Sequence, residues 1–323
     1  MKSRVKRVVK HTAQLALLLV LTYCWYLYVK KHWPHVRGFG EAVRWSNLAG
    51  GMVFTMLGYA IRGMLWSPFY HELTGKRLGL WNAFRISSIA WMGRYLPGKV
   101  WALAGKAYLS SADKSEVPGS AVAATVDVLW LLASGMLMTL GFLGGNSAAR
   151  EVLGGHSSVA WIVAGLGVLA CHPRVFFPLA NTLLRWTRQP PLLRPPRFWV
   201  MMLFLVANVV CFGFWTAGFV VMIEPGLLLD ASRFCETAGV FAGAWVFGFA
   251  VLLAPAGIGV RDSILALGLQ HVVGLPPDLV VAGVAISRIL TTLAESLCFL
   301  VAIAGPPICS VARRVSGRSP FRQ

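Results

Sequence analysis

Long apolar runs separated by short polar segments dominate this sequence. A helix needs about 20 apolar residues to cross the hydrocarbon core of a bilayer, which is about 30 Å thick. Runs close to this length lie at 12–29, 46–66, 119–141, 198–223 and 278–304, and a less regular one lies around 157–184. We therefore predict an all-α polytopic membrane protein. The composition agrees, because 57% of the residues are hydrophobic and only 13% are charged.

Two further apolar stretches contain helix-breaking residues. The stretch 80–109 is interrupted at Pro97 and Gly98, and the stretch 235–273 is interrupted by the segment APAGIGVRD. The sequence leaves open whether each stretch is a re-entrant pair of half-helices or two short spans. In both cases the two ends of the stretch lie on the same side of the membrane.

The distribution of cations predicts the orientation in the membrane. The chain has 30 Lys and Arg residues against 12 Asp and Glu residues, and the cations gather at both termini and in the linker 185–197. Because cytoplasmic loops are enriched in Lys and Arg, we expect both termini and this linker to be cytoplasmic. The loop 30–45 is also rich in cations and fits this threading badly. The pattern does not indicate the soluble basic face that nucleic-acid binding needs.

The predicted threading contains an internal repeat. Residues 46–141 and 198–304 each consist of a span, a broken stretch and a second span, and the break precedes the second span by the same number of residues in both halves. The halves enter their broken stretches from opposite sides, so they would be inverted repeats, as in many secondary transporters. The remaining segments are a retained first transmembrane helix at 1–30, a connecting region at 142–197 and a basic cytoplasmic tail at 305–323.

The broken stretches carry the predicted binding site. A break in a membrane helix frees backbone groups, which must be buried in protein or face a water-filled cavity. Pro97 suits the first turn of a new half-helix, whose free amides would bind an anion together with Lys99. In the second stretch Gly257 and Gly259 permit close backbone approach, while Arg261 supplies a cation. The predicted substrate-binding residues are Arg94, Pro97, Gly98, Lys99, Gly257, Gly259, Arg261 and Asp262, of which Asp262 would orient Arg261 or carry a proton.

Further ionisable residues lie inside or beside the predicted helices. Asp127, Arg288 and Glu295 would each cost about 2.5–3.5 kcal/mol at the centre of a membrane helix, so pairing or function must offset that cost. We interpret them as coupling residues or as a structural ion pair, either Asp127 with Arg288 or Arg288 with Glu295. Arg62, close to the end of its span, is expected to extend to the interface. Arg85 would either add to the basic cavity or lie on a solvated half-helix face.

Signatures of enzymes and metal sites are weak. The seven histidines form no metal-binding spacing, and the six cysteines are dispersed without a C-x-x-C pair. The segment GIG lacks the βαβ context of a dinucleotide-binding fingerprint. We therefore expect no catalytic residue, no metal and no cofactor.

Two segments carry a resemblance to a known family. RISSIAWMGRYLPGKVWALAGKAYL (85–109) and LLAPAGIGVRDSILALGL (252–269) resemble the signature regions of the lysylphosphatidylglycerol synthase transmembrane-region family, also called flippase-like domain proteins. The resemblance extends over about residues 40–305, without the soluble aminoacyl-transfer domain of the bifunctional members. The second motif of that family usually ends in Arg-Glu, where this chain has Arg261 and Asp262. The resemblance implies translocation of lipids with charged headgroups, such as aminoacylated phosphatidylglycerol or isoprenoid-linked sugars.

From these observations we expect a transporter that moves a phosphate-bearing or isoprenoid-linked lipid between the leaflets of the inner (plasma) membrane. The expected partners are the membrane and an anionic lipid headgroup, and no nucleic acid. Two alternatives remain open. A non-transporting scaffold would gather cell-envelope glycosyltransferases, with the linker 185–197 as its important surface. An intramembrane transferase would chemically alter a lipid carrier.

Overall fold

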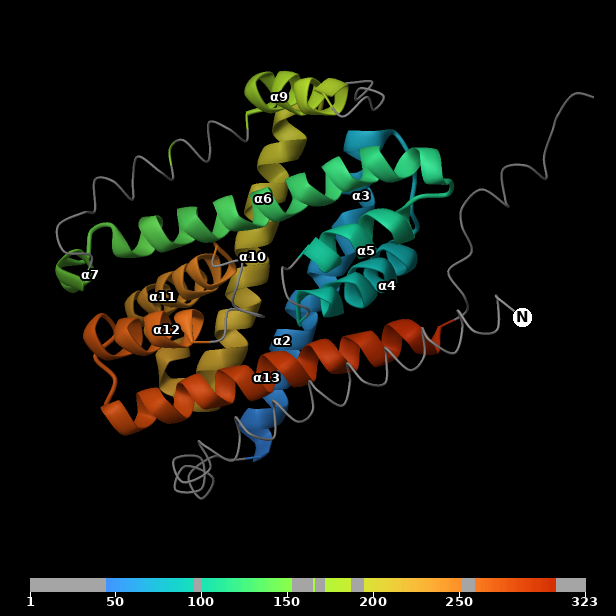
Figure 1. Cartoon of the computed structure of the whole chain (residues 1–323). Helices are drawn as coiled ribbons and strands as arrows, with labels where there is room; N and C mark the ends of the chain where they lie inside the picture. Colours follow the sequence, from blue (N-terminus) through green and yellow to red (C-terminus); the bar gives the residue numbers. More distant parts are fainter. Residues whose placement is uncertain are drawn as a thin grey trace, which may run out of the picture.

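The computed structural model describes residues 45–95, 100–152, 165, 172–186, 195–250 and 259–305. Every regular element within these ranges is helical (Figure 1). The first half contains α2 (Trp45–Met64), α3 (Trp66–Thr74), α4 (Leu80–Trp91), η1 (Met92–Tyr95), α5 (Val100–Ser110), η2 (Lys114–Glu116), α6 (Val117–Leu143) and α7 (Ser147–Val152). The remainder contains α9 (Pro173–Trp186), α10 (Phe198–Ile223), η3 (Pro225–Leu228), α11 (Ala231–Ala250), α12 (Val260–His271) and α13 (Pro277–Ala304).

Four helical segments are long and apolar enough to cross a membrane. They are Trp45–Thr74, which joins α2 and α3, Val117–Leu143, Phe198–Ile223 and Leu279–Ala304. They coincide with four of the spans expected from the apolar runs, so the prediction of a helical membrane-embedded protein is confirmed. The expected span 12–29 lies outside the described residues.

The outer surface of these helices is apolar, as contact with lipid requires. On α10 the side chain of Leu203 is 66% exposed, and Val206 and Val210 are exposed on the same helix. Buried positions on α6 include both large apolar side chains and the carboxylate of Asp127. Polar groups therefore gather inside the bundle, while apolar side chains cover its outside.

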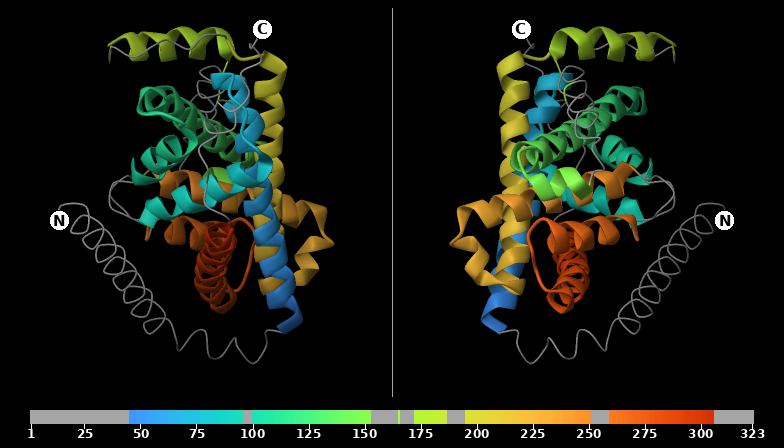
Figure 2. Two further views of the ribbon diagram at one scale, coloured as in Figure 1. Left: turned by 90° about the vertical axis from the view of Figure 1, so that its right-hand side faces the viewer. Right: turned by 90° about the vertical axis from the view of Figure 1, so that its left-hand side faces the viewer.

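Helices α2 and α10 pack antiparallel, and α6 and α13 cross them in opposite directions (Figure 1). Figure 1 shows α2 and α10 side by side, with α6 and α13 running across them, and Figure 2 shows α13 nearly end-on while α2 and α10 are seen lengthwise. Because α6 has 27 residues and α10 has 26, each is about 40 Å long, which exceeds a hydrocarbon core of about 30 Å. Helices of this length fit a bilayer when they are tilted from its normal. The wide angle at which α6 and α13 cross α2 and α10 agrees with such a tilt (Figure 1).

Glycines bring α2 and α10 into close contact. A Cβ atom added at Gly51 would lie 2.5 Å from the carbonyl oxygen of Gly218, and one added at Gly218 would lie 2.3 Å from Oγ1 of Thr55. Near the other end of the contact a Cβ atom at Gly58 would meet Trp215 at 2.6 Å. Any side chain larger than a hydrogen atom would force the two helices apart here.

Both broken stretches form antiparallel helical hairpins. In the first, Gly93 faces Ala102 and Gly105 faces Ala90, so α4 and η1 run back along α5. In the second, Gly248 faces Arg261 and Gly268 faces Val240, so α11 runs back along α12. The helices α4, α5 and α12 have only 11 or 12 residues and are about 18 Å long, too short to cross the bilayer alone. Only α11, with 20 residues, has the length of a span.

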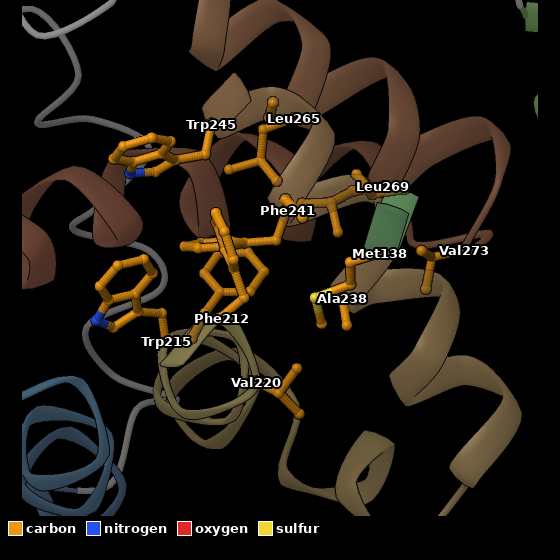
Figure 3. Close-up of a cluster of buried hydrophobic side chains, with 14 of the residues drawn as sticks. Met138, Phe212, Trp215, Val220, Ala238, Phe241, Trp245, Leu265, Leu269 and Val273 are labelled. Carbon is orange, nitrogen blue, oxygen red and sulfur yellow. The ribbon is translucent and has the colours of Figure 1, made fainter. Parts of the chain in front are cut away.

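A cluster of large side chains fixes the second hairpin against α10. Figure 3 shows Phe212 and Trp215 of α10 packed toward Phe241 and Trp245 of α11, with Leu265 of α12 above them. The rings of Phe212 and Trp215 meet edge to face with centroids 5.2 Å apart, a favourable aromatic geometry. A separate cluster packs α3 against α6 and α10, and its largest members are Trp66, Phe69, Tyr70, Trp130 and Phe204.

The contacts between elements follow the same order in both halves. In the first, α4 packs on α2 and α5 packs on α6; in the second, α11 packs on α10 and α12 packs on α13. Contacts between the halves also come in matched sets. Helix α6 packs on α11 while α13 packs on α4, and α6 packs on α10 while α13 packs on α2.

The helix α9 does not have the length of a span. The apolar run expected around 157–184 lies largely outside the described residues, and α9 covers only Pro173–Trp186 at its end. With 14 residues it is about 21 Å long, so it cannot cross the bilayer alone. Figures 1 and 2 show α9 lying across the end of the bundle where α10 begins.

Candidate anion-binding site between the hairpins

The adjacent ends of the two hairpins meet near the centre of the bundle. Trp91, at the end of α4, stacks on Trp245 of α11 with ring centroids 6.0 Å apart. Tyr59 of α2 lies within electrostatic reach of both Arg94 and Arg261. Arg94 and Arg261 belong to different broken stretches and are 167 positions apart in the sequence. They nevertheless lie in one region of the fold.

Glu295 joins the first hairpin to α13. Its carboxylate is 2% exposed and accepts hydrogen bonds from Arg94, from the hydroxyl of Tyr59 and, at 2.6 Å, from the hydroxyl of Tyr95. The guanidinium of Arg94 also lies over the ring of Trp91, with 5.2 Å from Cζ to the centroid. Arg94 is thus held by both an ion pair and an aromatic face.

Asp262 joins the second hairpin to α13. Its Oδ1 accepts a hydrogen bond from Nε of Arg288 at 2.6 Å, and its Oδ2 accepts one from Nη2 of Arg288 at 3.0 Å. The N–H of Gly259 also donates to Oδ2 at 3.1 Å. Asp262 therefore fastens α12 to α13. Gly259 begins α12 at a φ of 87°, a conformation that favours glycine.

Arg261 is buried without an ion pair among the described residues. Its side chain is 4% exposed, its guanidinium lies 5.3 Å from the centroid of the Phe241 ring, and its Nη2 has no hydrogen-bond partner in the described part of the chain. Asp262, expected from the sequence to orient Arg261 or to carry a proton, pairs instead with Arg288, and within the described residues it acts on Arg261 only through its charge. Two further arginines, Arg94 and Arg288, lie close enough to act electrostatically on Arg261.

A second buried cluster surrounds Asp127. Its Oδ1 lies 2.8 Å from Nη2 of Arg62, and its Oδ2 lies 2.6 Å from Nζ of Lys106. The ammonium of Lys106 is also 3.9 Å from the centroid of the Trp66 ring. One carboxylate therefore binds two cations, which come from α2 and α5.

Arg62 does not extend to the interface as expected. It is 7% exposed, and the reason is that the apolar helix continues beyond it through α3 to Thr74. The residue therefore lies well inside the segment. Arg85 is buried too, and it donates to the carbonyl oxygens of Ala302 and Gly305 at the end of α13. Neither of the two roles expected for Arg85 describes this position.

Among the described residues, the structure contains neither of the two expected ion pairs, Asp127 with Arg288 or Arg288 with Glu295. Asp127 pairs with Arg62 and Lys106, Arg288 with Asp262, and Glu295 with Arg94. The partners lie on different helices, so spacing along one helix does not reveal them. Of the remaining predicted site residues, Pro97, Gly98, Lys99 and Gly257 lie outside the described residues.

A pocket lies between the Asp127 cluster and Glu295. The pocket is small: the space that the centre of a water molecule can occupy in it is about 30 Å³, more than one water molecule needs. Its walls are Tyr59, Arg62, Gly63, Ser87, Ser88, Trp91, Met92, Lys106, Trp215, Glu295 and Cys298. Sequence reasoning missed Lys106, Tyr59, Trp91 and Trp215. A lysine in the apolar stretch 100–110 was the one available signal.

Most of the unsatisfied buried polar atoms in the described part of the chain are hydrogen-bond donors; on α10, Oδ1 of Asn208 is an acceptor and Oγ1 of Thr216 can be either. Five buried N–H groups have no partner among the described residues: Nε of Arg62, Nε of Arg94, Nη2 of Arg261 and Nε1 of both Trp91 and Trp215. None of these groups can accept a hydrogen bond. Because an unpaired buried donor costs about 1–3 kcal/mol, a ligand that supplies acceptors would recover that loss.

The buried ionisable side chains of the described chain carry a net positive charge. The buried cations of the described chain are Arg62, Arg85, Arg94, Lys106, Arg261 and Arg288, whereas the buried carboxylates are Asp127 and Glu295, with Asp262 partly buried. Cations thus exceed carboxylates inside the bundle, which favours an anionic ligand. No group of three or more His, Cys, Asp or Glu residues in the described part of the chain could hold a metal ion.

Comparisons with known proteins add no family to this picture. No family model matches the chain, and no curated protein matches it. The resemblance to the flippase-like domain proteins therefore rests on the two sequence motifs alone.

Proposed function

We propose that this protein moves a phosphate-bearing lipid between the leaflets of the inner membrane. The observation that carries the proposal is the donor-rich, cation-rich site at the meeting point of two helical hairpins, inside a bundle whose outside is apolar. Phosphate oxygens accept hydrogen bonds and carry negative charge, so a phosphate complements both properties of the site. The motif resemblance supports a lipid as the molecule that carries the phosphate.

An inverted repeat supports a transport role. Each half contains a long helix, a hairpin and a second long helix, and the contacts within and between the halves come in matched sets. In Figure 1 α2 and α10 run in opposite directions, as do α6 and α13, and the two hairpins lie on opposite sides of the crossing. Transporters built from inverted repeats bind their substrates at the repeat interface, typically at discontinuous helices.

Within this proposal the Arg94–Glu295 pair links the two halves. Arg94 belongs to the first hairpin and Glu295 to the last helix of the second half, while the other buried ion pairs lie within one half. A phosphate that binds Arg94 would weaken its attraction to Glu295 and allow the halves to move relative to one another. Substrate binding would then be coupled to the rocking motion that exposes the site to either leaflet.

The proposal is tested by reconstituting the full-length protein in liposomes. A phosphate-bearing lipid with a fluorescent headgroup is distributed over both leaflets, and a membrane-impermeant reductant is added outside. We expect the wild type to expose inner-leaflet lipid to the reductant, whereas protein-free liposomes keep it protected. The double variant Lys99→Ala/Arg261→Ala should lose this activity.

Lys76→Gln is the matched control, because it removes a cation from an exposed ion pair with Glu116 outside the site. It should transport like the wild type. Undiminished lipid movement in the double variant would refute the site. Absence of movement in the wild type, with every phosphate-bearing lipid offered, would refute the function.

A further inference from the structure

We propose that the pocket between Lys106 and Glu295 is a subsite for a doubly charged phosphate group, such as a phosphomonoester or a diphosphate. A singly charged phosphodiester would bind there less well. The lipid nature of the ligand rests on the function proposed above, whereas the preference for two charges rests on the pocket itself.

Donors from four different helices converge on this pocket. Arg62 comes from α2, Trp91 from α4, Lys106 from α5 and Trp215 from α10, and all four line the cavity. Nε of Arg62 and the indole N–H groups of Trp91 and Trp215 have no acceptor among the described residues. Lys106 already donates to Asp127 and has two further N–H donors. These groups can surround one tetrahedral anion.

The charge balance around the pocket indicates two negative charges rather than one. Asp127 can neutralise only one of its two cations, Arg62 and Lys106. Glu295 neutralises Arg94, which leaves Arg261 without an ion pair in the described chain. The pair of Arg288 with Asp262 is balanced. Among the described residues, this region therefore holds two positive charges in excess.

Burial makes this excess important for specificity. A charge removed from water is costly unless another charge compensates it, and charges interact more strongly in a medium of low dielectric constant. A phosphate dianion in the pocket would compensate the surplus charge of Arg62 and Lys106 directly, and that of Arg261, which acts electrostatically on Tyr59 of the pocket wall, through space. A phosphodiester would leave one of these surplus charges uncompensated, so binding should rank these headgroups by charge.

Equilibrium binding to the purified full-length protein in a neutral detergent tests this preference. The probes are short-chain phosphatidic acid, a phosphomonoester that carries a second negative charge in alkaline buffer, and the singly charged phosphatidylglycerol with the same acyl chains. We expect phosphatidic acid to bind at least about tenfold more tightly. Equal affinities, or tighter binding of phosphatidylglycerol, would overturn the proposal.

Two pocket variants test the assignment to this cavity. Lys106→Gln removes one surplus charge and should bring the two affinities within about threefold. Trp215→Phe keeps an aromatic ring but removes one N–H donor, so it should weaken binding of both lipids. Lys76→Gln, which alters an exposed lysine, should retain the wild-type preference. A wild-type preference in Lys106→Gln together with wild-type affinities in Trp215→Phe would place the anion elsewhere and refute the subsite.

Inorganic phosphate distinguishes a lipid from a soluble ligand. If inorganic phosphate, which is mainly a dianion under these conditions, competes with phosphatidic acid at similar concentration, the subsite takes a free dianion, which supports the charge assignment without the lipid. The function can fail separately. A clear preference for phosphatidic acid without leaflet exchange would uphold the subsite and refute transport. Leaflet exchange without any charge preference would uphold transport and refute the subsite.

Discussion

Asp127 binds two cations with one carboxylate in the interior of a membrane protein. Arg62 and Lys106 reach it from different helices, and Trp66 covers the ammonium of Lys106. A single buried charge at the centre of a membrane helix costs about 2.5–3.5 kcal/mol, so the three charges are tolerable only together. The cluster therefore stabilises the contact of α2 and α5 with α6 and supplies surplus positive charge to the pocket.

Replacing Asp127 with asparagine should destabilise the protein. The substitution leaves Arg62 and Lys106 buried without a carboxylate, and breaking a buried pair in this way costs about 3–5 kcal/mol. The thermal unfolding midpoint in detergent should fall clearly below that of the wild type. Asp113→Asn, a change at an exposed carboxylate, is the control that should leave it unchanged. A wild-type midpoint for Asp127→Asn would contradict the role of the cluster.

Replacing Glu295 with glutamine should strengthen anion binding. The amide keeps the shape of the side chain, but Arg94 then loses its carboxylate and becomes a third surplus cation. Binding of phosphatidic acid should tighten by about tenfold, while the thermal midpoint falls. Weaker binding in titrations of this variant would show that Glu295 contacts the ligand favourably, contrary to our account.

The ion pair of Lys76 with Glu116 lies outside the candidate membrane spans, and its contribution to stability should depend on pH. Burial alone would raise the pKa of the Glu116 carboxyl, but hydrogen bonds from Lys76 and from the N–H of Ala112 outweigh it and lower that pKa. A lowered pKa stabilises the fold above the ordinary carboxyl value of about 4.3, and this contribution is lost as the pH falls through the folded-state pKa.

Glu116→Gln should therefore be slightly less stable than the wild type at pH 7, by less than about 1 kcal/mol because the pair is exposed. The difference in unfolding midpoint should shrink as the pH is lowered below about 4. A difference that persists or grows on acidification would show that the pair does not act through the charge of Glu116.

At the residue scale, a local signal in the sequence pointed to two of the buried cations. Arg94 and Arg261 accompany helix breaks, and both lie within electrostatic reach of Tyr59 in the fold. Lys106 gave only the signal of a lysine inside an apolar stretch, because its partner Asp127 lies on another helix. The sequence pattern assigns no role to the tryptophans of the pocket, since an indole N–H without an acceptor is visible only in three dimensions.

At the scale of elements, apolar length identified the four long helices correctly. It could not decide the form of the broken stretches, because a run of apolar residues with a break is compatible with either two spans or a returning hairpin. The packing of Gly93 on Ala102 and of Gly248 on Arg261 shows that both stretches turn back. The contribution of the backbone amides at Gly98 stays a prediction.

The close packing of α2 on α10 can be tested by substituting one glycine at the contact and a control glycine elsewhere on α10. Gly218→Ala would place a methyl group 2.3 Å from Oγ1 of Thr55, and overpacking of this kind costs about 1–3 kcal/mol. Gly213→Ala is the matched control on the same helix, because nothing lies within 4 Å of an added Cβ atom there. The thermal midpoint should fall for Gly218→Ala only. Equal midpoints would contradict the contact.

At the scale of the whole molecule, the matched contacts of the two halves explain why the site lies where it does. Two hairpins that approach from opposite sides bring their cations to the same place, and the crossing helices supply Asp127, Arg288 and Glu295 around them. The order of spans and breaks predicts an inverted repeat, which stays a prediction. The ion pairs could not be inferred, because the charges that meet belong to helices distant in sequence.

The central claim is that these buried donors hold the phosphate of a lipid. Native mass spectrometry of the purified full-length protein tests it most directly. The wild type should retain a phosphate-bearing lipid, Arg261→Gln should retain much less, and Arg197→Gln, which alters an exposed ion pair with Glu72, should retain as much as the wild type. A wild type without any phosphate-bearing lipid, or equal retention by Arg261→Gln, would contradict the account.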